Sequence, residues 1–94
     1  MQNSIEYFLT KLENADNIAK NEIENKIVNI GSDAIPELVN TLQVVRGIKR
    51  GVVAMSLIRI GEDSIKYLKE AAAKNTDFQW IAKYLISEIQ GQVA

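Results

Sequence analysis

Hydrophobic residues recur along the chain at spacings of three and four residues, which is the spacing of one face of an α-helix. Two stripes show this spacing most clearly, Ile5-Phe8-Leu9-Leu12 and Ile35-Leu38-Val39-Leu42. Polar residues fill the positions between them, as on the solvent side of a surface helix. The pattern predicts an all-α chain with six helices, at about 3–13, 16–30, 33–43, 46–60, 63–73 and 76–90.

Turn and cap residues lie at these predicted boundaries. Gly31 and Gly61 lie where a helix must stop and turn, and glycine adopts a left-handed C-cap without a steric penalty. Pro36 falls in the first turn of the third helix, where a missing N–H costs nothing. Short polar or acidic side chains predict the N-caps: Ser32 or Asp33 for the third helix, Glu62 or Asp63 for the fifth, and Asn75-Thr76-Asp77 for the last.

The pattern also repeats every thirty residues. Segments 28–38 and 58–68 align without a gap, and their identical pairs are Ile30/Ile60, Gly31/Gly61, Asp33/Asp63, Ile35/Ile65 and Leu38/Leu68. The repeat predicts one domain over 1–94 made of three antiparallel helical hairpins, at about 3–30, 33–60 and 63–90. A single hairpin cannot bury its own apolar face, so we expect the copies to stack.

Two segments resemble a known family. Arg50-Gly-Val-Val-Ala-Met-Ser-Leu-Ile-Arg-Ile-Gly61 and Ile30-Gly-Ser-Asp-Ala-Ile-Pro-Glu-Leu-Val-Asn-Thr-Leu42 resemble the HEAT-like repeats, particularly the short bacterial variety first described in phycobilisome lyases. The resemblance implies a right-handed α-solenoid whose second helices line a concave face that commonly receives partners. It also implies two alternative functions, an accessory subunit for attaching or removing a phycobilin chromophore and a nucleic-acid-binding protein.

The amino-acid composition argues against an enzyme and against a nucleic-acid-binding protein. The 94 residues contain no cysteine and no histidine, which excludes a disulfide framework and removes the commonest general base and metal ligand. The net charge of −1 lacks the basic excess of a dedicated nucleic-acid binder. We therefore expect no enzymatic activity, no cofactor and no metal, and a protein partner rather than a nucleic acid.

The sequence shows neither the pattern of a signal peptide nor that of a membrane span. Residues 1–10 contain Glu6 and no apolar run, so they do not form a signal peptide. No stretch approaches the roughly 18 consecutive apolar residues of a membrane span. We expect a cytoplasmic protein that does not associate with membranes.

The fourth helix carries a candidate binding surface. It is basic, with Arg46, Lys49, Arg50 and Arg59. At 100° per residue, Lys49, Ser56 and Arg59 are predicted to lie on a solvent-facing arc. Such a strip could dock acidic side chains or phosphate. The alternative is a solvated face with a structural role for Arg50.

The last helix carries the second candidate. Its predicted core stripe is Phe78, Ile81, Ala82, Leu85 and Ile89, and Trp80, Tyr84 and Ile86 lie outside that stripe. Terminal repeats normally have a polar outer face, and large aromatic residues are typical interface anchors. With Lys83, these residues predict an open edge that binds a partner or a second copy of the chain. In the alternative, Trp80 and Tyr84 fold back over the fifth helix.

Together these features predict a non-catalytic protein-interaction module, either an adaptor or a small regulatory subunit. The predicted partner-binding residues are Arg46, Lys49, Arg50, Ser56, Arg59, Trp80, Lys83 and Tyr84.

Overall fold

The structure, a computed structural model, describes residues 4–93. Every regular element within that range is a helix and none is a β-strand, which confirms the all-α prediction. The α-helices are α1 (Ser4–Thr10), α2 (Asn17–Ile30), α3 (Ile35–Leu42), α4 (Ile48–Ile60), α5 (Asp63–Lys74) and α6 (Gln79–Val93). Two short 3₁₀ turns, η1 (Gly31–Ala34) and η2 (Thr76–Phe78), lead into α3 and α6.

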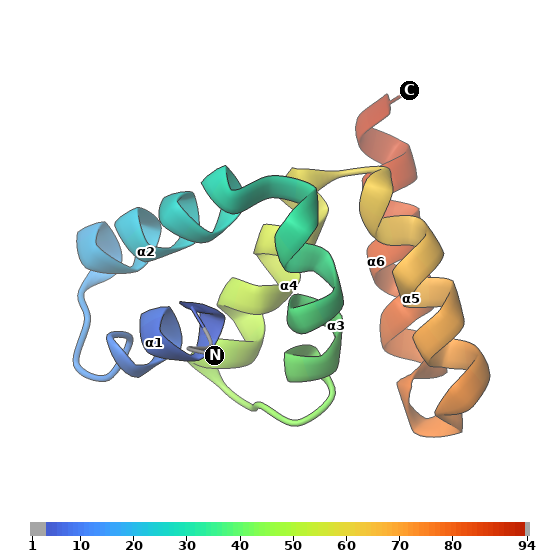
Figure 1. The fold of residues 1–94 in the computed structure, drawn as a ribbon, viewed down its shortest axis with the longest axis horizontal. Coiled ribbons are helices and arrows are strands. Elements are labelled where there is room, and N and C mark those ends of the chain that lie inside the picture. The colour runs from blue at the N-terminus through green and yellow to red at the C-terminus, as the bar shows by residue number, and fades with distance from the viewer. Residues whose placement is uncertain (1–3, 94) are drawn as a thin grey trace.

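Helix α4 lies at the centre of the molecule (Figure 1). It packs against α2 and α6, and it also contacts its neighbours along the chain, α3 and α5. Helices α5 and α6 lie side by side at one end, and α3 contacts α5. Helix α1 packs against α2 at the other end. The principal extents of 33 × 29 × 25 Å are those of one compact body.

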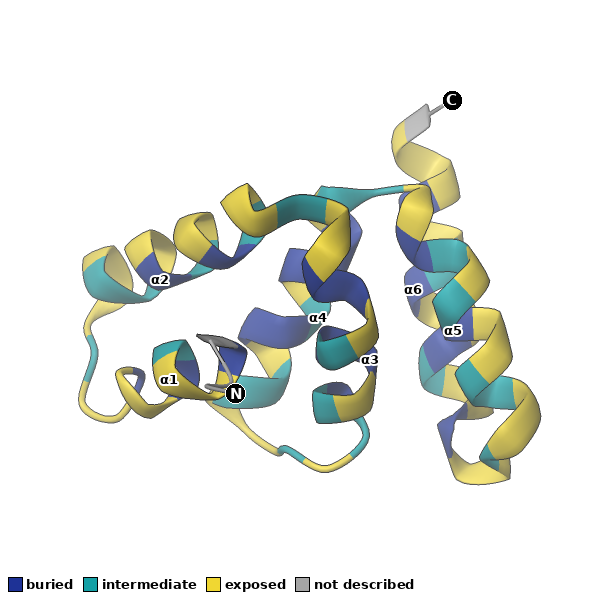
Figure 2. Cartoon of the chain, viewed as in Figure 1, coloured by how far each residue is buried: buried dark blue, intermediate teal, exposed yellow. Residues whose placement is uncertain are grey.

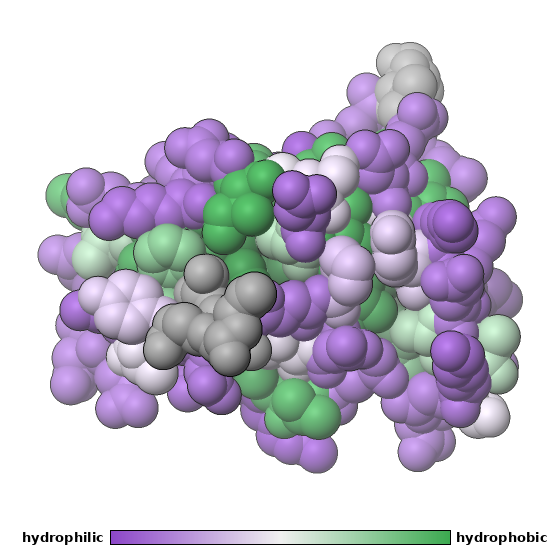
Figure 3. All heavy atoms as spheres, in the orientation of Figure 1, coloured by the Kyte–Doolittle hydropathy of each residue, from purple (hydrophilic) through white to green (hydrophobic). Residues whose placement is uncertain are grey.

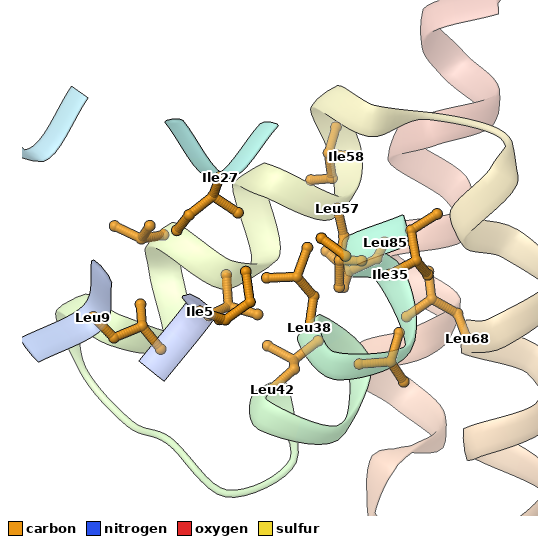
Figure 4. Close-up of a cluster of buried hydrophobic side chains, with 14 of the residues drawn as sticks. Ile5, Leu9, Ile27, Ile35, Leu38, Leu42, Leu57, Ile58, Leu68 and Leu85 are labelled. Carbon is orange, nitrogen blue, oxygen red and sulfur yellow. The ribbon is translucent and has the colours of Figure 1, made fainter. Parts of the chain in front are cut away.

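The predicted apolar stripes form the core of this body. Residues thirty apart are buried alike, as in the pairs Ile5 with Ile35 and Leu38 with Leu68. The close-up in Figure 4 shows side chains from separate helices pointing toward one another, whereas the outer side of α2 is largely exposed (Figure 2). Each fully buried Leu or Ile contributes about 1.5–3 kcal/mol, so this shared interior is the main source of stability.

A glycine turn occurs twice, as the repeat predicts. Gly31 and Gly61 both have positive φ, +79° and +96°. The backbone N–H of Gly31 donates to the carbonyl of Val28, three residues earlier, and that of Gly61 donates to the carbonyl of Leu57, four residues earlier, so a glycine ends both α2 and α4. The two turns are linked directly, because the hydroxyl of Ser32 donates to a carboxylate oxygen of Asp63 at 2.6 Å.

Two of the three capping predictions are wrong, since no side chain among the described residues caps α3 or α5. Ser32 and Asp33 lie within η1, which runs directly into α3, and no side chain caps α3. Glu62 has helical backbone angles and likewise caps nothing at α5. The cap predicted near Asn75 is confirmed, since its side-chain oxygen accepts from the backbone N–H of Asp77 at 3.2 Å.

Several helix ends differ from the prediction. Helix α1 ends at Thr10 and gives way to a turn whose Asn14 has a φ of +63°. Residue 3, the predicted start of this helix, lies outside the described residues. Helix α4 begins at Ile48 because Gly47 takes a φ of +65°, which excludes Arg46 from the helix. Helix α6 continues to Val93, past its predicted end at residue 90.

Candidate functional site

Ser56 does not belong to any binding surface. The prediction that it faces solvent is wrong: its side chain is fully buried, and its hydroxyl donates to the carbonyl of Val52 at 2.7 Å. Projection onto a helical wheel assumes one buried side, but α4 packs against helices on more than one side. Its buried arc is therefore wide, and a serine fits there because its own helix satisfies the hydroxyl.

Arg59 is exposed as predicted, but it also has a partner inside the chain. Its guanidinium lies 2.8 Å from a carboxylate oxygen of Glu24, and this ion pair connects α4 to α2. The Glu24 side chain is only 13% exposed, whereas that of Arg59 is 40% exposed. Partly exposed pairs of this kind contribute at most about 1 kcal/mol. Arg59 thus orients two helices as well as contributing positive charge.

Three of the predicted residues line one surface pocket. Arg46, Arg50 and Trp80 surround a cavity of about 270 Å³, which we call the Arg50–Trp80 pocket. It lies between the α3–α4 loop, the first part of α4, and the start of α6. The other residues lining it are Leu42, Gln43, Val44, Val45, Asn75, Asp77, Phe78 and Ile81. The basic strip and the aromatic edge, predicted as separate features, therefore meet at one place.

Local structure holds the two walls of this pocket together. The side-chain amide of Asn75 donates to the side-chain oxygen of Gln43 at 3.0 Å, which joins the α5–α6 connection to the end of α3. Phe78, at the end of η2, is buried and anchors the start of α6 in the core. With Phe78 fixed, Trp80 projects outward and is 69% exposed.

The pocket combines positive charge with apolar surface. Among the described residues, neither Arg46 nor Arg50 forms an ion pair, so both guanidinium groups can receive an external anion. Asp77 also lines the pocket and offsets one of the two charges. Exposed Val44 adds apolar surface beside Trp80, and Figure 3 shows hydrophobic atoms at the lower edge, over the α3–α4 loop. Such a site could hold a carboxylate next to an apolar side chain.

The remaining predicted residues lie around this pocket or on other faces. Tyr84 is 58% exposed and follows Trp80 by one helical turn, so neither aromatic side chain is sealed inside the chain. The alternative in which both side chains are buried over α5 is therefore wrong. Lys49 lines a separate pocket with residues of α1 and α3, and Lys83 lies in a groove between α5 and α6.

Sequence reasoning missed the pocket residues between the α-helices, namely Gln43, Val44, Val45, Asn75 and Asp77. Val44 gave a usable signal, because it is apolar, precedes Arg46 and falls between two predicted helices. The amide pairing of Gln43 with Asn75 gave none, because it depends on how the hairpins pack.

Comparison of the chain with protein-family models, curated proteins and solved structures finds no match in any of the three. Within residues 4–93, no helix has both the length and the apolar character needed to cross a bilayer.

Proposed function

We propose that this chain is a non-catalytic protein-binding module, an adaptor or a small regulatory subunit, which binds its partner at the Arg50–Trp80 pocket. One observation carries the proposal. Two guanidinium groups that have no ion-pair partner within residues 4–93 line the same cavity as a 69% exposed indole from a different helix. Arginine and tryptophan are the residue types that most often dominate binding energy at protein interfaces.

The architecture supports this proposal. We propose that the three helical hairpins stack as a short, right-handed HEAT-like solenoid. The packing of α4 between α2 and α6 fits a layer of second helices, and the contact of α3 with α5 fits a layer of first helices. The thirty-residue repeat of buried positions and glycine turns fits three equivalent units. Tyr84 and Trp80 then lie on the second-helix layer.

The pocket indicates the chemistry of the bound segment. A cavity of about 270 Å³ is smaller than most small-molecule sites and suits one or two side chains. The guanidinium groups favour a carboxylate, which they can bind with two parallel hydrogen bonds. The indole and Val44 favour an apolar neighbour of that carboxylate. The best ligand is therefore a protein segment in which an acidic residue adjoins a large apolar one.

Quantitative affinity capture from host extract tests this function. The wild-type chain is compared with the double variant Arg50→Glu with Trp80→Ala, and bound proteins are identified by mass spectrometry. A matched control, Lys26→Glu with Ile18→Ala, makes the same kinds of change on the exposed side of α2. A partner held at the pocket should be retained by the wild type and the control, and lost from the pocket variant.

The purified partner should then bind the pocket variant at least tenfold more weakly than the wild type, since interface anchors typically contribute about 2 kcal/mol or more. Equal retention by all three chains would contradict the proposal. So would retention that disappears when the extract is treated with nuclease, because the ligand would then be a nucleic acid.

A further inference from the structure

The outer side of the α5–α6 hairpin contains a second surface feature. A groove of about 460 Å³ runs between these helices. It is lined by Lys69, Ala72, Ala82, Lys83, Ile86, Ser87 and Gln90. None of these residues lines the Arg50–Trp80 pocket, so the two sites can be altered separately.

The repeat shows how this side differs from its equivalent in the preceding hairpin. Thirty residues before Lys69 and Ala72 are Val39 and Leu42 of α3, which are both buried. Val39 lies on the side of α3 that meets α5, since it lines a pocket together with Tyr67 of α5. In α5 the equivalent position is an exposed lysine. The groove thus occupies the position where α3 packs against α5 in the preceding unit, but an exposed charged residue replaces a buried apolar one.

The groove differs from the equivalent surface of α3 mainly in its positive charge. Lys69 and Lys83 come from opposite sides of the groove, are exposed, and form no ion pair within the described part of the chain. Of the residues that the structure describes, no acidic one lines the groove. The half-buried Ile86 and Ala72 give the groove apolar surface beside the two lysines. The surface therefore suits a ligand with an apolar face bordered by negative charge.

We propose that this groove binds an amphipathic α-helix of a partner protein, with acidic residues flanking the helix's apolar face. A helix is the shape that fits a groove between two helices, because its side-chain ridges can enter the groove. In the preceding hairpin the equivalent surface is covered by α5 itself. The acidic flanks would meet Lys69 and Lys83, and the apolar face would cover Ile86.

The same charges oppose binding of a second copy of the chain. A symmetric dimer through this groove would bring the lysines of one copy toward those of the other. In a head-to-tail stack the groove would meet the α1–α2 end, where a pocket is lined by Lys11 and Lys26 with one acidic residue, Glu22. Like charges brought together in this way disfavour both arrangements.

The test uses two synthetic amphipathic peptides of about 16 residues, or about four helical turns, with the same leucine stripe. One peptide carries glutamates beside the stripe and the other carries lysines. Each is titrated into the isotopically labelled chain, and backbone amide NMR shifts locate the site. The acidic peptide should shift amides of α5 and α6 around the groove and should bind at least tenfold more tightly than the basic one.

The variants separate this site from the proposed pocket. Lys69→Glu with Lys83→Glu should weaken binding of the acidic peptide about tenfold, because two favourable pairs become repulsive. Lys66→Glu with Lys74→Glu makes the same charge change on α5 outside the groove and should change affinity less than threefold. Arg50→Glu with Trp80→Ala should leave peptide binding unchanged, even if those substitutions abolish partner capture.

Three results would overturn the inference. The first is no shift at millimolar acidic peptide, and the second is equal binding of both peptides. The third is dimerisation in sedimentation experiments that Lys69→Glu with Lys83→Glu alters, because the groove would then belong to a second copy.

Discussion

Helices α2 and α6 follow the same internal plan and present different outer surfaces. Each inserts apolar residues into the shared core, such as Ile27 and Leu85. The outer side of α2 is mainly polar, with Asn21 and Asn25 among its exposed residues, whereas α6 exposes Trp80. The buried apolar stripe is therefore enough to specify each helix, and the residues on its outer side can vary and form a binding surface.

An exposed apolar residue alone does not mark a binding surface. Ile18 on α2 is 72% exposed, slightly more than Trp80. Trp80 differs because it shares a cavity with two arginines and an exposed valine from another hairpin. Four predictions test this distinction, in order of decreasing effect.

The largest effect should come from the core that both helices share. Leu57→Ala removes a fully buried side chain at the centre of α4 and should lower the free energy of unfolding by about 3 kcal/mol. Urea denaturation followed by circular dichroism measures this loss. Ile18→Ala, the exposed control, should change stability by less than about 0.5 kcal/mol. Similar losses for the two variants would mean that α4 is not central to the core.

The second effect should appear in binding rather than in folding. Trp80→Ala with Tyr84→Ala should cost about 2 kcal/mol of partner affinity, or roughly thirtyfold, because both rings are exposed in the free chain. Helical content and melting temperature should remain close to those of the wild type. Calorimetric titration measures the affinity, and a solution mass measurement on both proteins detects any oligomer that depends on these rings. A large loss of helicity would show that the aromatics serve folding instead.

The third effect concerns the glycine turns at Gly31 and Gly61, which end α2 and α4. Gly61→Ala should destabilise the fold by about 1–2 kcal/mol, because an alanine there must adopt a backbone conformation that only glycine takes easily. A new methyl group would meet no atom within 4 Å, so the whole cost is conformational. Gly31→Ala should cost about the same. Thermal unfolding compares the two, and a clear difference would show that the turns are not equivalent.

The smallest effect should come from the ion pair that joins α2 to α4. Arg59→Ala should reduce stability by about 0.5 kcal/mol, and added salt should shrink the difference from the wild type. A double-mutant cycle with Glu24→Gln isolates the interaction. A coupling above about 2 kcal/mol would contradict a pair in which one side chain is 40% exposed.

The sequence predicts the helices and the repeat well because both depend on local spacing. Stripes such as Ile35 to Leu42 form a helical face whatever lies opposite, and Gly31 and Gly61 terminate helices through their own backbone freedom. Ser56 was misplaced because its burial depends on helices packed around α4. The placement of Arg50 and Trp80 at one pocket could not be predicted, since it depends on how α6 packs against α4.

The bond between Gln43 and Asn75 has a mechanical consequence for the molecule. It joins the end of α3 to the connection between α5 and α6, and both residues line the Arg50–Trp80 pocket. Any bending of α5 and α6 relative to α3 and α4 would change the width of that cavity. A ligand bound in the cavity would restrict this bending. It would therefore slow amide hydrogen exchange around both Gln43 and Asn75.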